Sequence, residues 1–167
     1  IPTGVVEHII RKAKQYHVYT ILNAAPAKEM DREVLKMVDC LIVNETEASF
    51  YAGADMTDGD MVRAHADRLR QLTDGTVIVT LGSKGSMLLG EEGAVPIDPV
   101  KVERVTESTG AGDSYIGAFA YGKFKGMTDL QACCFAARAA SVTVTKIGAQ
   151  EAMPCLSEMN ESRLPDV

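Results

Sequence analysis

Apolar residues recur along this chain at two spacings, one typical of amphipathic helices and one typical of short buried strands. A spacing of three to four residues predicts helices over 4–16, 31–37, 58–72, 112–124 and 128–144. Asn44 and Gly53 are residue types that begin and end helices, so a further helix is expected between them. Runs rich in Val, Ile, Leu and Thr predict strands at 18–22, 40–43, 76–81, 86–89, 95–97 and 100–102.

This alternation of helices and strands favours an α/β layered domain with a largely parallel sheet. Ligands of such sheets bind beyond the carboxyl ends of the strands, and three polar, glycine-rich motifs follow predicted strands here. Pro96 places its strand at an edge of the sheet. The buried stripe expected on the helix over 58–72 consists of Met61, Ala64, Leu69 and Leu72.

Composition and charge narrow the class of protein. The chain has 167 residues, 46% of them hydrophobic, which suits one soluble globular domain. Its 23 acidic residues outnumber its 17 basic ones, and the net charge of −6 disfavours a basic nucleic-acid-binding surface. No apolar run approaches the roughly 18 residues of a membrane helix. Because Ile1 stands where a start methionine would be, we expect the chain to begin inside a longer protein.

The cysteines and histidines give no sign of a metal site or a disulfide framework. The four cysteines form no C-x-x-C pair, and the three histidines form no H-E-x-x-H motif. Cys133 and Cys134 lie in an alanine-rich apolar stretch that is typical of small core residues. Reduced thiols and a cytoplasmic location are therefore expected.

The glycine-rich segment 110–113 precedes a predicted helix and is the strongest candidate for chemistry. Its glycines allow a tight turn and a close approach of the backbone to a ligand. Amides at the start of a helix, together with the helix dipole, favour a bound phosphoryl group. Asp113 in the first turn is then placed to accept a proton from an attacking hydroxyl. The same residue types are ordinary capping features, so this segment alone leaves both interpretations open.

Two further motifs admit a structural and a functional interpretation. Asn44 and Glu47 have the spacing of a capping box, which is the favoured interpretation of this pair taken alone. Their oxygen atoms also suit a magnesium–phosphate complex held through water. The segment 80–85 ends a predicted strand in a glycine turn, which fits either a hairpin loop or one side of a nucleotide site.

In order and spacing, these motifs together resemble the ribokinase (PfkB) family of sugar kinases. The family signature D-T-x-G-A-G-D is matched by E-S-T-G-A-G-D at 107–113. Segments 23–27 and 146–150 are similar to the family's N-P-A-P-A and R/K-x-G-A-Q, and the resemblance extends to about Pro154. The N-x-x-E and T-x-G-x-x-G motifs are matched by Asn44, Glu47, Thr80, Gly82 and Gly85.

The resemblance implies a phosphotransferase that uses ATP and magnesium. Asp113 would be the catalytic base that deprotonates the primary hydroxyl of the sugar. The backbone amides of Gly110, Ala111 and Gly112 would hold the charge on the transferring phosphoryl group. Asn44 and Glu47 would organise magnesium and its water around the phosphates. The residues implied to line the nucleotide side are Thr80, Gly82, Ser83 and Gly85.

The resemblance also implies a monovalent cation, expected to be potassium, held mostly by backbone carbonyls. Such an ion would brace the turn at 110–112 and add positive field. Glu107 stands where an aspartate is usual, and Ala152 lies about where some relatives have a serine. Both departures affect the implied cation site more than the implied role of Asp113 as the base. The residues implied to surround the cation are Glu107, Thr109, Lys146 and Gly148.

For the whole chain, the resemblance implies a ribokinase-like three-layer α/β/α fold that lacks its N-terminal strands and lid. Residues 1–167 would form a single C-terminal fragment with a weakly structured tail after about residue 154. The implied reaction transfers the ATP γ-phosphate to the 5-hydroxyl of D-ribose, in a protein that is a homodimer when full length. Neither nucleic acid nor membrane is an expected partner. Fructose, adenosine or another nucleoside as acceptor, and a non-catalytic nucleotide-binding fragment, stay open as alternatives.

Overall fold

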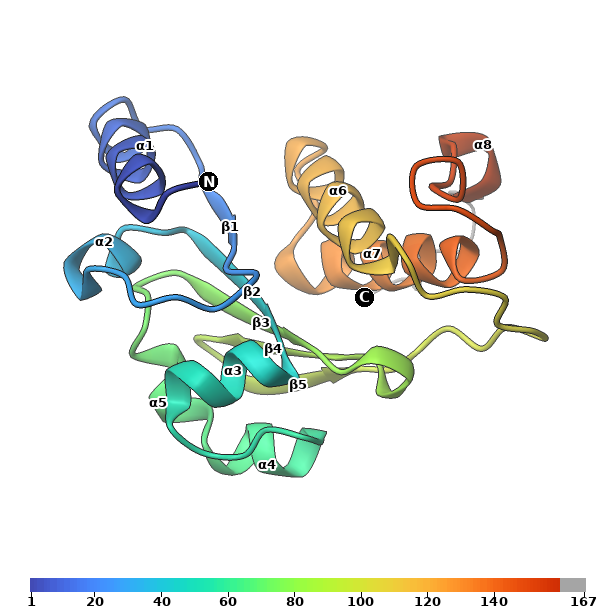
Figure 1. Ribbon diagram of the computed structural model, residues 1–167, viewed down its shortest axis with the longest axis horizontal. Helices are drawn as coiled ribbons and strands as arrows, with labels where there is room; N and C mark the ends of the chain where they lie inside the picture. Colours follow the sequence, from blue (N-terminus) through green and yellow to red (C-terminus); the bar gives the residue numbers. More distant parts are fainter. Residues whose placement is uncertain (160–167) are drawn as a thin grey trace. The chain divides into compact units, whose positions relative to one another are not determined.

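The computed structural model describes residues 1–159, which divide into two compact units (Figure 1). The first unit comprises Ile1–Gly82 and Met87–Pro96, and the second comprises Ser83–Ser86 and the described residues from Ile97 onward. In chain order the elements are α1 (Thr3–Gln15), β1 (Ile21–Asn23), α2 (Arg32–Lys36), β2 (Cys40–Asn44), α3 (Glu45–Ala52), α4 (Gly59–Ala64), α5 (Ala66–Arg70), β3 (Thr76–Thr80), η1 (Gly82–Lys84), β4 (Ser86–Gly90), β5 (Gly93–Ile97), α6 (Ala111–Phe124), α7 (Asp129–Thr143) and α8 (Leu156–Met159).

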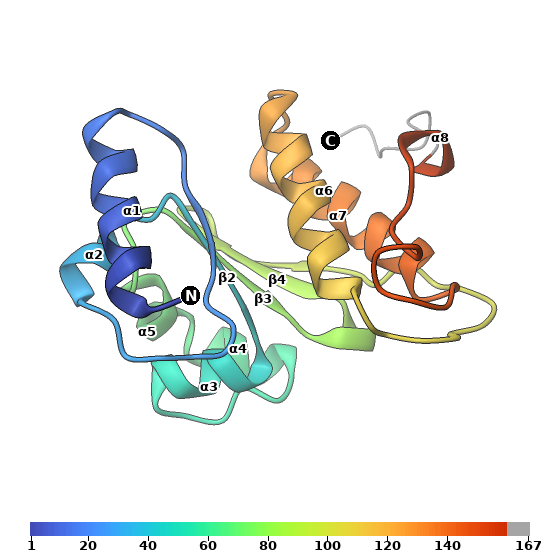
Figure 2. The ribbon, with the colours of Figure 1, turned by 45° about the horizontal axis from the view of Figure 1, so that its top comes forward.

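The strands form one five-stranded sheet in the order β1-β2-β3-β4-β5. The middle strands β2, β3 and β4 are labelled in Figure 2. β2 pairs in parallel with both β1 and β3, and its Leu41 lies beside Leu22 on one side and Val77 on the other. β5 is an edge strand, as Pro96 predicts, because proline cannot donate a ladder hydrogen bond. These observations confirm the predicted α/β class with a largely parallel sheet.

The central strands are buried over consecutive positions rather than alternate ones. Residues 40–43 in β2 and 77–79 in β3 are at most 2% exposed. Such near-continuous apolar runs are typical of parallel strands. α3 and α5 pack on these strands, and Ala48 and Leu69 are buried in the same core. The packing fixes the carboxyl ends of β2 and β3, which carry two of the predicted site motifs.

In the second unit, α6 and α7 pack against each other. Gly122 permits a close approach, because a Cβ at this position would lie 3.0 Å from the Cβ of Ala132. Phe119 is fully buried, and Tyr121 stacks on Phe135 with ring centroids 5.6 Å apart. This helix pair gives Asp113, at the start of α6, a rigid support.

The prediction of one continuous helix over 58–72 is wrong. α4 and α5 replace it and are separated at His65, whose φ of −114° is not helical. The predicted stripe is also wrong at its first two positions, because Val62 is fully buried while Met61 is half-buried and Ala64 is exposed. Met61 and Val62 are both apolar, and the pattern does not reveal which of two adjacent apolar residues faces the core.

Two predicted strands are shortened or missing in the structure. The strand expected at 18–22 begins only at Ile21, because Asp39 Oδ2 accepts hydrogen bonds from the amide and the hydroxyl of Thr20, both at 2.8 Å. The strand expected at 100–102 does not form, and Val100 is 44% exposed. A β-rich run becomes a strand only where a neighbouring strand can pair with it.

Within residues 1–159, none of the helices is both long enough and apolar enough to cross a lipid bilayer.

In the tail that the sequence predicts to be weakly structured, α8 covers Leu156–Met159. Residues 160–167 of this tail lie outside the described part of the chain.

Candidate active site

The first predicted motif, at the start of α3, forms a complete capping box. The Glu47 amide donates to Asn44 Oδ1 at 2.9 Å, and the Asn44 amide donates to Glu47 Oε2 at 2.9 Å. Gly53 ends the helix in the left-handed region, with φ +63°. The structural interpretation of this pair is therefore confirmed. A role towards magnesium stays a prediction, and it would add to the capping role, because Glu47 keeps a second carboxylate oxygen.

The fold of the first unit brings the Asn44 and Thr80 motifs together. The two residues are register partners at the carboxyl ends of the parallel strands β2 and β3. Gly82 follows with φ +54°, and a Cβ there would lie 4.0 Å from Glu45 Oε1. The Glu45 carboxylate of α3 thus borders the first glycine of the T-x-G-x-x-G segment. Glu45 and Gly82 are far apart along the chain, and the parallel pairing of β2 with β3 brings them together.

The donor set at this edge of the sheet suits a cation that is shared with a ligand. Carboxylate and amide oxygens are the hard ligands that magnesium prefers. Within residues 1–159, no cluster of three or more His, Cys, Asp or Glu side chains is arranged to hold a metal. Magnesium bound by Asn44 and Glu47 would therefore need phosphate oxygens and water to complete its coordination.

The later residues of the glycine loop belong to the second unit. Gly85 has φ +88°, and a Cβ there would lie 2.1 Å from the carbonyl oxygen of Ile97, so the backbone packing demands glycine. Ser83, by contrast, is exposed, and its side chain is open to a ligand. The loop therefore combines a tightly packed backbone at Gly85 with an accessible tip.

The strongest predicted motif begins α6. Gly110 has φ +79° in the left-handed region, and no side chain caps the helix. The Ala111 amide donates to the Ser108 carbonyl at 3.2 Å, and the Ser114 amide starts the helix by donating to the Gly110 carbonyl at 2.9 Å. The first amides of an α-helix lack carbonyl partners within it, so this start presents donors to an anion. Asp113 lies beside them, exposed.

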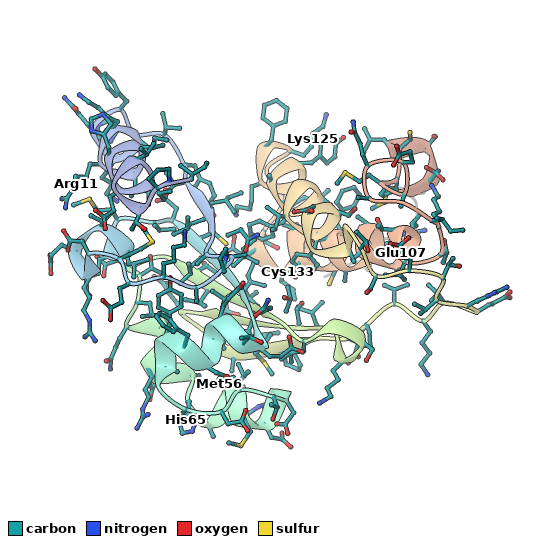
Figure 3. The ribbon with its side chains drawn as sticks, viewed as in Figure 1. Arg11, Met56, His65, Glu107, Lys125 and Cys133 are labelled. Atoms are coloured by element: carbon teal, nitrogen blue, oxygen red, sulfur yellow. The ribbon has the colours of Figure 1, made fainter. Side chains whose placement is uncertain are left out.

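The segment before Gly110 is tied to the loop after α7. The Gly148 amide donates to Glu107 Oε2 at 3.1 Å, and a hydrogen bond from Thr109 also reaches this carboxylate. Glu107 is labelled in Figure 3. Both bonds, that of Thr109 foremost, lower the pKa of Glu107. Three of the four residues implied for the monovalent cation thus lie together. The fourth, Lys146, turns its Nζ to Glu158 at 2.6 Å, so only its backbone is available to a cation.

A feature that the sequence did not reveal is a cavity of about 220 Å³ beside Asp113. Its walls are mostly apolar and come from α6, α7 and the segment that ends in α8. No periodic pattern marked this last segment, because its apolar residues belong to a loop and one short helix. The lining residues are Asp113, Ser114, Gly117, Ala118, Tyr121, Phe135, Ala139, Met153, Pro154, Leu156 and Met159.

Comparison with known proteins places this geometry in a family. The model of the pfkB family of carbohydrate kinases matches residues 3–156. A ribokinase of Staphylococcus aureus is 34% identical over 162 residues, which cover 96% of this chain and 53% of that protein. A ribokinase of Haemophilus influenzae is 31% identical, with 96% of this chain and 52% of that protein covered.

Solved structures give the same result for the fold. The structure of an Arabidopsis thaliana ribokinase complexed with ribose and ATP superposes with a TM-score of 0.88 at 29% identity, over 95% of this chain and 52% of that one. The chain spans about half the length of these relatives. The family match covers all of the predicted site motifs, so the chain belongs to the pfkB family of carbohydrate kinases.

Proposed function

We propose that this chain supplies the nucleotide site and the catalytic base of an ATP-dependent ribokinase. The observation that carries the proposal is the start of α6, where a left-handed Gly110 and the lack of a side-chain cap leave amides available beside Asp113. The relatives named ribokinase, at 34% and 31% identity, support ribose as the acceptor.

In the proposed reaction, the oxygen of the 5-hydroxyl of D-ribose attacks the γ-phosphorus of ATP, and Asp113 accepts the proton of this hydroxyl. The bond from the γ-phosphorus to the bridging oxygen breaks, and ADP leaves. The amides of Gly110 and Gly112 stabilise the charge that is spread over the transferring group, since donors fixed by the fold need little reorganisation, whereas the Ala111 amide already donates to the Ser108 carbonyl. The exposed position of Asp113 supports this role, because the carboxylate must reach a substrate.

The cations have separate proposed places. Magnesium, when bound, neutralises phosphate charge, and Asn44 and Glu47 would hold it through water. Potassium would lie near Glu107, Thr109, Lys146 and Gly148, and its charge would favour phosphate at the neighbouring turn. The contact of Glu107 with the Gly148 amide supports an ordered loop at this place. Homodimer formation and a cytoplasmic location stay predictions.

A second candidate acceptor is deoxyribose. A deoxyribokinase of Salmonella typhimurium is 31% identical over 93% of this chain and 51% of that protein, which is about as similar as some of the ribokinases. The two sugars differ in the 2-hydroxyl alone, so the choice depends on a single hydrogen-bonding group of the sugar site.

The test is turnover of the full protein with ATP and a panel of ribose, deoxyribose, fructose and adenosine. We expect ribose to give the highest kcat/KM. A preference for deoxyribose, fructose or adenosine would show that ribose is the wrong acceptor, while the proposed kinase activity would stand. ATP binding without turnover of any acceptor would favour a non-catalytic nucleotide-binding protein, and the absence of ATP binding would overturn the proposed function.

A further inference from the structure

Tyr115 lies two residues after Asp113 on α6 and is only 5% exposed. Its hydroxyl lies 2.9 Å from Ser86 Oγ, in a hydrogen bond to which either group can donate. Ser86 is 2% exposed and directly follows Gly85, the last residue of the glycine loop. A buried hydrogen bond therefore joins this loop to the helix that carries Asp113, within the second unit.

Two neighbouring residues hold the end of the loop. Ser86 holds it through the side-chain hydrogen bond to Tyr115, and Gly85 holds it through backbone packing. Gly85 packs so tightly on Ile97 that a Cβ would overlap the Ile97 carbonyl. Ser83 and Lys84, at the tip, are exposed. Two fixed positions at the end of a loop with an exposed tip keep the tip near one conformation, which lowers the entropy that a ligand must remove on binding.

Tyr115 is itself held in place from α7. The Cys133 thiol, which is fully buried, forms a hydrogen bond with Tyr115. Burial raises the pKa of Cys133 to about 12, and the contact with Tyr115 opposes this rise only in part. The thiol is therefore neutral at ordinary pH and acts as a fixed partner of the phenol rather than as a reactive group.

We propose that Tyr115 is a positioning residue that fixes the loop at 83–86 relative to Asp113. The inference rests on the proposed function, in which this loop lines ATP and Asp113 acts as the base. The Tyr115 hydroxyl holds the loop at 83–86, and the backbone of the same turn of α6 holds Asp113.

The experiment compares Tyr115→Phe with the unchanged full protein by calorimetric titration of ATP. Loss of one buried hydrogen bond is expected to weaken ATP binding roughly three- to tenfold. The KM for ribose should stay within about twofold, because the proposed function assigns this loop to ATP and not to the sugar. Ser86→Ala should weaken ATP binding by a similar factor, and the double variant should be no weaker than the worse single one, because both remove the same bond.

Thr73→Val is the matched control for the loss of a buried hydroxyl. Thr73 is 4% exposed and its hydroxyl bonds the Val38 carbonyl in the first unit. This variant should lower Tm and leave ATP affinity unchanged. Unchanged ATP affinity in Tyr115→Phe and Ser86→Ala, additive effects in the double variant, or an equal loss in Thr73→Val would each overturn the positioning role. If the unchanged protein binds no ATP, the proposed function itself fails.

Discussion

α6 and α7 belong to the same unit and have similar lengths of 14 and 15 residues, yet they begin in opposite ways. At the start of α7, the Gln131 amide donates to Thr128 Oγ1 at 3.2 Å and the Thr128 amide donates to Gln131 Oε1 at 3.0 Å. At the start of α6, Gly110 supplies no side chain at all. The start of α7 is capped by side chains of the protein, whereas the start of α6 has no side-chain cap and leaves the Gly112 amide for a ligand.

α3 shows that a family motif and a structural cap can be the same residues. Asn44 and Glu47 match the N-x-x-E motif, and they also form a complete capping box. A motif match therefore does not by itself separate a ligand site from a cap. The missing side-chain cap at α6 is the more informative feature, because an ordinary cap would have blocked the amides that a phosphoryl group needs.

The largest expected effect comes from Asp113→Asn in the full protein. The amide cannot accept a proton from the sugar hydroxyl, so kcat should fall by about a thousandfold, within the range for general-base catalysis. ATP affinity should change little, because the amides at the start of α6 remain. Steady-state kinetics with calorimetry checks both values, and near-normal kcat would remove Asp113 as the base.

Gly110→Ala should damage both the fold and the reaction. Its left-handed φ of +79° disfavours a side chain, and the new Cβ would lie 3.1 Å from the Ala149 carbonyl oxygen. The free energy of unfolding should fall by about 1–2 kcal/mol. The distorted turn should also lower kcat. Urea unfolding and initial rates measure the two effects, and an unchanged kcat would show that the turn does not contact the reacting group.

Thr128→Ala is the counterpart at α7. Loss of the cap should lower the free energy of unfolding by about 1 kcal/mol. We expect kcat and the ATP affinity to be unchanged, since this helix start is satisfied internally. Urea unfolding together with initial rates tests the contrast. A fall in kcat similar to that of Gly110→Ala would erase the difference between the two helices.

The smallest expected effect concerns Glu107, which holds the segment leading into α6. Hydrogen bonds from Thr109 and the Gly148 amide lower its pKa, so its stabilising contribution is present above the unfolded-state pKa and is lost as pH falls through the lower folded-state value. Glu107→Gln should remove this part of the acid destabilisation. Thermal unfolding between pH 7 and pH 3 would show it as a smaller drop in Tm, and an unchanged pH profile would contradict it.

Local signals in the sequence predicted the helix starts well and the tertiary contacts poorly. The capping box of Asn44 and Glu47 follows from side chains three residues apart, so it was predicted correctly, and the helix expected from residue 128 begins at Asp129 behind the Thr128 cap. The strand expected at 100–102 lacks a neighbouring strand to pair with, which a short window of sequence does not reveal, and the break at His65 interrupts a helical spacing that is continuous in the sequence.

For the candidate site, the sequence predicted the segments but not the contacts that hold them in place. The register that pairs Asn44 with Thr80, the contact of Glu107 with Gly148, and the bond of Tyr115 to Ser86 all join residues far apart in the chain. The cavity beside Asp113 had no periodic signal, because its walls come from three separate segments.

The most direct measurement is a crystal structure of the full protein with ADP, magnesium and aluminium fluoride, which mimics the transferring phosphoryl group. We predict that the fluoride lies against the amides at the start of α6, within hydrogen-bonding distance of the Gly112 amide and next to the Asp113 carboxylate. Aluminium fluoride bound at another place, with the start of α6 open to solvent, would contradict the role of this helix in phosphoryl transfer.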